Sequence, residues 1–134
     1  MRKASVSEVK EAVSETLDIY ERTFRFACRV LKMDRALAKD RRVNRQAMHQ
    51  LVAASSSIGA NMEEARAGQS KADFHAKLRI ALKEARESHY WLRLLLCSDS
   101  IKPERIEPLL QEANEIVAIL TTIAKKTNPR NPAE

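Results

Sequence analysis

Glycine and proline are scarce in this chain, with two Gly and four Pro among 134 residues. Turn-rich β architectures need many more residues that permit tight turns, and phosphate-binding loops need clusters of glycine. These counts exclude all-β folds and glycine-rich nucleotide sites, and they leave an all-α fold. A chain of this length is expected to form one domain, residues 1–134, around a single hydrophobic core.

Apolar residues recur at spacings of three and four along four segments, as in helices with one buried face. The expected helices span about residues 8–39, 44–67, 71–98 and 104–126, and a loose tail follows at 127–134. Because short connectors make long amphipathic neighbours antiparallel, we expect an up-down-up-down four-helix bundle.

Each expected helix has a predicted core face. The face of the first helix comprises Val9, Val13, Leu17, Tyr20, Phe24, Ala27, Leu31 and Leu37. In the second it comprises Met48, Leu51, Val52, Ser55, Ile58, Met62 and Ala65. The third contributes Phe74, Leu78, Ala81, Leu82, Ala85, Leu92, Leu95 and Leu96. The fourth contributes Ile106, Leu109, Leu110, Ala113, Ile116, Val117, Leu120 and Ile123.

Capping residues support these boundaries. Ser7 can accept a hydrogen bond from the first turn of the first helix, and the segment 70–73 has the form of a capping box. Gly68 can end the second helix with a positive φ. Pro103 suits a first helical turn, whereas Pro108 either begins the helix or kinks it.

Charge and cysteine content indicate the compartment. The formal net charge is +6 and the pI is about 9.6. Two isolated cysteines, Cys28 and Cys97, do not form a disulfide framework, so we expect a reducing environment and two small core residues. No signal peptide is evident, and the longest apolar run, 116–120, is too short to cross a membrane. We therefore expect a soluble cytoplasmic protein without membrane contact.

The segments 50–65, 70–74 and 80–85 resemble the bacterial 23S rRNA intervening-sequence protein family. That family's pattern is S-I-x-x-N-x-x-E, a short turn with Gly and Ser, and a D/E-F helix carrying I-A-x-x-E. The matching residues are Ser57, Ile58, Asn61, Glu64, Gly68, Ser70, Asp73, Phe74, Ile80, Ala81 and Glu84. The close match covers about residues 46–97. Gly59 and Ala65 depart from it, since many members carry proline and glycine there.

The resemblance implies a small helical bundle that assembles into a ring-like homopentamer. Some members are encoded within insertions in 23S rRNA genes, and many others stand alone. Relatives include accessory proteins of diversity-generating retroelements, which bind nucleic acid and a reverse transcriptase. Most members have no established biochemical activity, so the resemblance implies more about the fold than about the function.

The second half of the first helix and the connector after it are rich in cations. Spacings of three and four place several of these cations along one stripe of the helix. The candidate phosphate contacts are Arg22, Arg25, Arg29, Lys32, Lys39, Arg41, Arg42 and Arg45. Clustered cations suffice to bind a phosphate backbone. The alternative is a solvated face whose charges suit the helix dipole.

The third helix carries a weaker basic set, which consists of Lys77, Arg79, Lys83, Arg86 and Arg93. Glu84 and Glu87 lie among these cations, and we expect pairs within the helix to neutralise part of the set. A solvated face is therefore the favoured interpretation of the third helix, with a ligand surface as the alternative.

Asn61 and Glu64 lie one helical turn apart, near the mid-helix Gly59. Because glycine in a helix costs ~1 kcal/mol relative to alanine, its presence predicts the close approach of another backbone. We interpret Asn61 and Glu64 as a structural hydrogen-bonded polar pair in a packed contact. Catalysis or metal binding by Glu64 is the disfavoured alternative, because no second ligand has the required spacing.

We predict no catalytic residue, metal site or cofactor. The chain's His residues occur in no H-x-x-x-H or E-x-x-H pattern, and neither cysteine has a histidine at helical spacing to activate it. Apolar residues beyond those that one core needs predict a subunit contact instead. These candidates are Ile80, Trp91, Leu94 and Ile119, and the alternative is a broad core stripe.

The sequence therefore favours a non-enzymatic homo-oligomer, expected to be a pentamer, with a basic surface that binds RNA or DNA without sequence preference. A structural scaffold that binds a protein partner, with no nucleic-acid binding, is the alternative.

Overall fold

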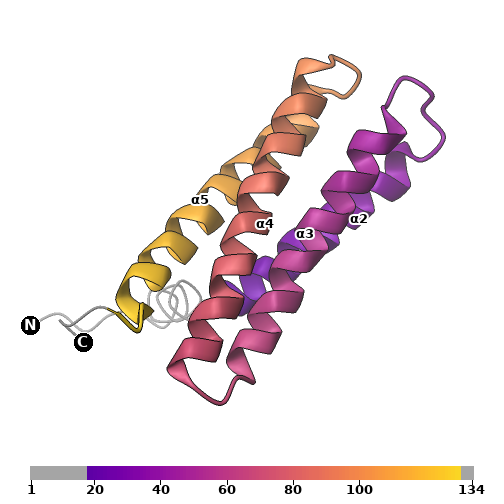
Figure 1. The fold of residues 1–134 in the computed structure, drawn as a ribbon. Coiled ribbons are helices and arrows are strands. Elements are labelled where there is room, and N and C mark those ends of the chain that lie inside the picture. The colour runs from indigo at the N-terminus through magenta and orange to yellow at the C-terminus, as the bar shows by residue number, and fades with distance from the viewer. Residues whose placement is uncertain (1–17, 131–134) are drawn as a thin grey trace, which may run out of the picture.

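The computed structural model describes residues 18–130, and within that range it contains four helices and no strand. The helices are α2 (Ile19–Leu37), α3 (Arg45–Arg66), α4 (Lys71–Cys97) and α5 (Pro103–Thr127). Figure 1 shows them lying side by side, with consecutive helices running in opposite directions. The predicted all-α, up-down-up-down bundle is confirmed.

The four helices pack in a ring. The most extensive contact joins α3 to α4, followed by α4 with α5 and α2 with α3, and α2 with α5 closes the ring. Helices on the diagonals, such as α2 and α4, hardly touch. The connectors after α2 and α4 lie at one end of the bundle, and the connector after α3 lies at the other (Figure 1). Because α2 and α4 are diagonal in this ring, their outward faces lie on opposite sides of the bundle.

The core consists of the predicted faces of α3, α4 and α5. On α3 the buried residues include Met48, Leu51, Ile58 and Met62. On α4 they include Leu78, Ala81, Leu92 and Leu95. On α5 they are Ile106, Leu109, Ala113, Ile116 and Leu120. Each of these helices has one dominant apolar row, so its buried face is readable from spacing alone.

The predicted core face of α2 was wrong in part. Tyr20 and Leu37 pack against the core as predicted, and Val9, Val13 and Leu17 lie outside the described residues. Phe24 and Leu31 are 63% and 50% exposed, and the helix buries Thr23, Phe26, Val30 and Met33 instead. α2 carries two apolar rows of helical spacing, and the row of larger residues is not the one that faces the bundle. The buried Thr23 hydroxyl donates to the Ile19 and Tyr20 carbonyl oxygens at 2.8 and 3.0 Å, so its burial leaves no polar group unpaired.

The start of the first predicted helix also needs correction. α2 begins at Ile19, and Asp18 is its N-cap with φ −158° and ψ 52°, so the helix does not continue through Asp18. The Asp18 carboxylate accepts the Glu21 N–H at 3.4 Å, which is an N-cap bond. The predicted cap at Ser7 and the helical segment 8–17 lie outside the described residues.

The other helix ends follow local capping chemistry. The Asn44 and Ser70 side chains accept the N–H groups of Ala47 and Asp73 at 2.9 and 3.0 Å, so the predicted start of α4 is confirmed. Pro103 occupies the first turn of α5, and the helix continues through Pro108. Its last residue is Thr127, one residue beyond the predicted end, and residues 131–134 of the expected tail lie outside the described range.

Gly68 follows the end of α3 without a positive φ, contrary to the prediction. Among the described residues, a positive φ outside glycine occurs at Asp99, in the connector between α4 and α5. Gly68 donates its N–H to the Ala65 carbonyl at 3.1 Å. A side chain at Gly68 would meet that same carbonyl oxygen at 3.1 Å, so space rather than φ favours glycine here.

Within residues 18–130, no helix combines the length and the apolar character needed to cross a bilayer.

The predicted close approach of a backbone to Gly59 is confirmed. A Cβ built on Gly59 would lie 3.6 Å from the Thr23 carbonyl carbon and oxygen and 3.7 Å from the Phe24 nitrogen. These are ordinary van der Waals separations, so a methyl group fits between α2 and α3 at this point.

We therefore expect Gly59→Ala to stabilise the protein by about 0.5–1 kcal/mol, because alanine loses less backbone entropy in a helix than glycine. Urea unfolding followed by circular dichroism measures the change. Gly68→Ala is the matched comparison and should not stabilise, since its methyl group crowds the Ala65 carbonyl. A Gly59→Ala variant less stable than the parent would show that the helices cannot accommodate the methyl group.

Candidate nucleic-acid interface

The eight cations predicted to contact phosphate divide into two groups. Four of them form ion pairs within the protein: Arg22, Arg25, Arg42 and Arg45. The other four are exposed and make no salt bridge among the described residues: Arg29, Lys32, Lys39 and Arg41. The second group is the one available to an anionic ligand.

Arg22 ties α2 to α5. Its Nε donates to a Glu112 oxygen at 3.1 Å, its Nη2 bonds to the other Glu112 oxygen, and Nη2 lies 3.3 Å from Glu115. Both Arg22 and Glu112 are largely shielded, with side-chain exposures of 25% and 17%. The Glu112 hydrogen bonds raise the pKa of Arg22 further above its ordinary value. The Arg22 side chain thus joins α2 to α5 and is not available to a ligand.

Two other paired cations stabilise the connector between α2 and α3. Arg45 donates to an Asp34 carboxylate oxygen and to the Leu37 carbonyl, both at 3.2 Å. Arg42 makes a two-pronged contact with Asp40 at 3.0 and 3.1 Å. The hydrogen bond from the Arg42 side chain lowers the pKa of Asp40. These pairs order a tight turn, and their charges are compensated within the protein.

A cleft between α2 and α5 gathers three exposed cations that make no salt bridge within residues 18–130. Arg29 and Lys32 of α2 line it together with Arg105 of α5, and Met33, Pro108 and Leu109 complete its wall. Its volume is about 310 Å³, and no acidic residue lines it. We call Arg29, Lys32 and Arg105 the cation triad. The sequence analysis did not predict Arg105, because residue spacing along one helix does not show which side chains of another helix lie beside it.

A second group of free cations lies on the outward face of α4. Arg79, Lys83 and Arg86 are exposed, make no salt bridge among the described residues, and line one shallow cleft with Ile80 and Leu82. We call Arg79, Lys83 and Arg86 the α4 ridge. Lys77, in contrast, pairs with Glu64 at 2.7 Å.

The expected neutralisation of the α4 cations by Glu84 and Glu87 does not occur through salt bridges in the described structure. The Trp91 indole N–H donates to Glu87 at 3.3 Å. Burial, followed by the Glu87 charge, raises the pKa of Glu84, and the Lys83 charge opposes that rise. Arg79, Lys83 and Arg86 form no salt bridge with either carboxylate, so such pairs do not neutralise the α4 ridge.

Asn61 and Glu64 take different partners. The Asn61 amide donates to the Ser57 carbonyl and hydroxyl at 2.9 and 3.1 Å. Glu64 is 59% exposed and forms the salt bridge to Lys77 that joins α3 to α4. Each residue fixes a local contact, and the structure does not join them into the predicted pair.

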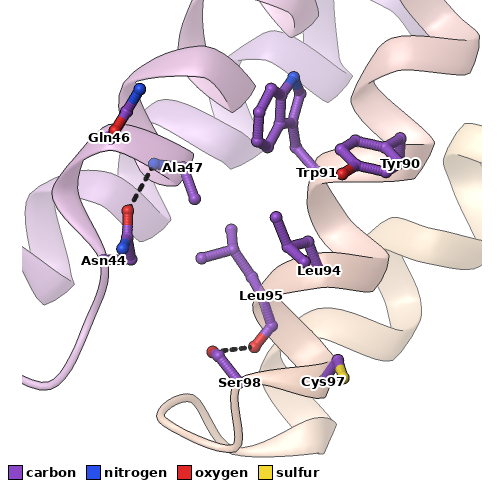
Figure 2. A pocket seen from close by; sticks show the side chains of 9 residues that line it. All are labelled: Asn44, Gln46, Ala47, Tyr90, Trp91, Leu94, Leu95, Cys97 and Ser98. Atoms are coloured by element: carbon purple, nitrogen blue, oxygen red, sulfur yellow. Dashed lines mark hydrogen bonds between the residues drawn. The ribbon is translucent and has the colours of Figure 1, made fainter.

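The apolar candidates for a subunit contact differ in exposure. Ile80 and Leu94 are each 41% exposed, whereas Trp91 and Ile119 are half-buried and Trp91 packs against the core. Figure 2 shows Trp91 and Leu94 beside a cleft between the start of α3 and the end of α4. Cys97, also at this cleft, is exposed, which corrects the prediction of a core residue, and Cys28 is half-buried.

No group of three His, Cys, Asp or Glu side chains is positioned to hold a metal ion within residues 18–130.

We expect Arg22→Gln to destabilise the protein by about 1–3 kcal/mol, because it leaves the shielded Glu112 carboxylate without its partner. Arg25→Gln is the matched control. Its pair with Glu21 is an exposed contact within one helix, which is worth about 0.3–0.5 kcal/mol. Thermal unfolding of both variants measures the difference. Equal stability of the two would show that Arg22 contributes no more than a surface cation.

The comparisons with known proteins agree with this architecture. The family model described as 23S rRNA-intervening sequence protein matches residues 15–122. A crystal structure of a protein of unknown function from the S23 ribosomal protein family of Bacteroides thetaiotaomicron is 36% identical. Its TM-score is 0.75, and the match covers 81% of this chain and 99% of that one. No curated protein matches the sequence. On this evidence the chain belongs to the 23S rRNA-intervening sequence protein family.

Proposed function

We propose that this chain is a non-enzymatic, homo-oligomeric cytoplasmic protein that binds RNA or DNA through the phosphate backbone. The cation triad carries the proposal. Three cations from two helices, with no salt bridge to any described residue, line one cleft whose described lining has no acidic residue, which is the charge arrangement that phosphate oxygens require. Phosphate contacts carry no sequence information, so the binding is expected to be indifferent to sequence.

Neighbouring free cations extend the surface. Lys39 and Arg41 lie in the connector between α2 and α3 and make no salt bridge among the described residues. Four of the eight predicted cations form ion pairs within the protein. The proposed binding surface is therefore smaller than the predicted one and is centred on α2 and α5. A pentamer, as the resemblance implies, would repeat this surface five times and raise the overall affinity through avidity.

A triple variant, Arg29→Gln with Lys32→Gln and Arg105→Gln, tests the cation triad. If all three contact phosphate, the slope of log affinity against log salt should fall by about 2–3, at ~0.7–0.9 per contact. Gel-shift titration with RNA and with DNA at several salt concentrations measures the slope. Helix content should not change, because all three side chains are exposed.

The matched control replaces Arg25, Arg42 and Arg66 with Gln. This control removes the same net charge from exposed side chains that have partners in the protein: Glu21, Asp40 and Glu63. Its slope should stay close to that of the parent. A parent that binds neither RNA nor DNA at low salt would instead favour the scaffold that binds a protein partner.

We further propose that copies associate through the outward face of α2. Phe24 and Leu31 are large apolar residues that are 63% and 50% exposed. They line an apolar cleft of about 330 Å³ with Tyr20, Ala27 and Cys28. Exposed apolar patches of this kind are typical of protein contacts. We propose this face as the leading candidate in place of the contact predicted from sequence, which comprised residues of α4 and Ile119 of α5.

Phe24→Glu with Leu31→Glu should therefore yield a smaller particle that is still fully helical, as measured by light scattering and circular dichroism. Ile80→Glu with Leu94→Glu tests the α4 face in the same way and should leave the mass unchanged. A smaller mass for the α4 variant together with an unchanged mass for the α2 variant would show that the subunit contact lies on α4. A loss of mass in both variants would indicate a head-to-tail ring that joins two different faces.

A further inference from the structure

The cleft between the start of α3 and the end of α4 has the size and lining of a small-molecule site. Its volume is about 540 Å³, within the range of ligand pockets. Tyr90, Trp91 and Leu94 supply an apolar wall from α4, and the first turn of α3 forms the opposite wall (Figure 2). The two rings meet edge to face, with centroids 5.0 Å apart and planes at 77°. Tyr90 remains 51% exposed, so a flat ligand can reach it from solvent.

The polar groups around the cleft leave one side-chain amide available. The Asn44 side-chain oxygen accepts the Ala47 N–H, and the Ser98 hydroxyl donates to the Leu95 carbonyl, as the dashed lines in Figure 2 show. Gln46 makes no hydrogen bond to any described residue and is exposed. Its amide can both donate and accept, which is what the edge of a heterocyclic ring requires.

Positive charge leads to this cleft from two directions. The α4 ridge, Arg79, Lys83 and Arg86, continues at the same helical spacing to Tyr90, so these side chains share one face of α4. The face from Arg79 to Tyr90 is about 16 Å long, at ~1.5 Å per residue. On the other side, the N-terminal turn of α3 contains no acidic residue, so the positive end of its dipole is not neutralised there.

We propose that this cleft takes one unpaired base of single-stranded RNA or DNA, which stacks on Tyr90 while its neighbouring phosphates follow the α4 ridge. This inference deepens the proposed function and rests on it for the class of ligand. It adds a preference for single strands, because the bases of a duplex are already stacked and cannot enter the cleft. Stacking on an aromatic ring tolerates every base, so the indifference to sequence is retained.

Charge complementarity favours a nucleic acid over a second copy of the chain in this cleft. The outward faces of α4 and α2 both carry free cations, so a contact between them would bring like charges together. A polyanion neutralises these charges and also supplies the flat apolar ring that the Tyr90 surface accommodates.

The test compares a short fluorescein-labelled oligouridylate with an RNA duplex of the same length, using the full chain. Tyr90→Leu should weaken oligouridylate binding roughly 5- to 150-fold, the range for loss of one stacked base, and should leave duplex binding unchanged. Tyr90→Phe keeps the ring and should bind within about twofold of the parent. His49→Leu, which removes an exposed ring of α3 that does not line the cleft, is the control and should not change either affinity.

The fluorescence of Trp91 reports directly on whether the cleft is occupied. Trp91 is the only tryptophan, and its ring touches Tyr90. Saturating oligouridylate should quench its fluorescence in the parent and in Tyr90→Phe, but not in Tyr90→Leu. Circular dichroism and light scattering confirm that each variant keeps its helices and its mass.

Three results would overturn the inference: equal affinity of the parent for both probes, an unchanged oligouridylate affinity in Tyr90→Leu, or a smaller particle mass in Tyr90→Leu. The last would show that a second copy covers the cleft. The proposed function fails separately. If the cation-triad variant keeps the parent's salt slope while Tyr90→Leu loses single-strand binding, the triad is refuted and the base cleft stands.

Discussion

The packing of α3 against α4 is the contact on which the rest of the structure depends. It is the most extensive contact in the bundle, and small side chains are buried on both helices, including Ala54 and Ser55 on α3 and Ala81 and Ala85 on α4. Small residues let helix axes approach closely, because the separation of packed helices follows the size of the side chains between them. Larger residues, Trp91 and Leu94, occur toward the C-terminal end of α4, where the cleft opens. A close contact in the middle of the two helices and a lined cleft at one end thus come from the same pair of helices.

Much of the fold was predictable because three helices have one apolar row each. The same rule failed for α2, where Phe24 and Leu31 repeat with helical spacing just as Phe26, Val30 and Met33 do. Spacing identifies a face but does not say which of two faces meets the bundle. That choice depends on packing against the other helices, such as the contact of the Thr23 backbone with Gly59, and on pairing of the Thr23 hydroxyl.

The candidate site was less predictable because charge pairing is a property of the folded chain. Arg22 and Arg29 occupy one stripe of the sequence, yet Arg22 is neutralised by Glu112, ninety residues away, whereas Arg29 stays free. Arg105 joins Arg29 only through the packing of α5 on α2. Pairing within one helix was also misjudged on α4, where Glu84 and Glu87 form no salt bridge with Arg79, Lys83 or Arg86. Sequence located the basic segments, and tertiary contacts decided which cations remain available to a ligand.

The position of Pro108 gives the two walls of the α2–α5 cleft different stiffness. Because proline has no N–H, the Glu104 carbonyl loses its usual partner within the helix, and the first turn of α5 is held by fewer hydrogen bonds. Arg105 lies on that weakly held turn, whereas Arg29 and Lys32 lie within a continuous helix. Local opening costs less where fewer bonds hold the backbone. The wall of the cleft that carries Arg105 is therefore easier to displace than the wall that carries Arg29 and Lys32.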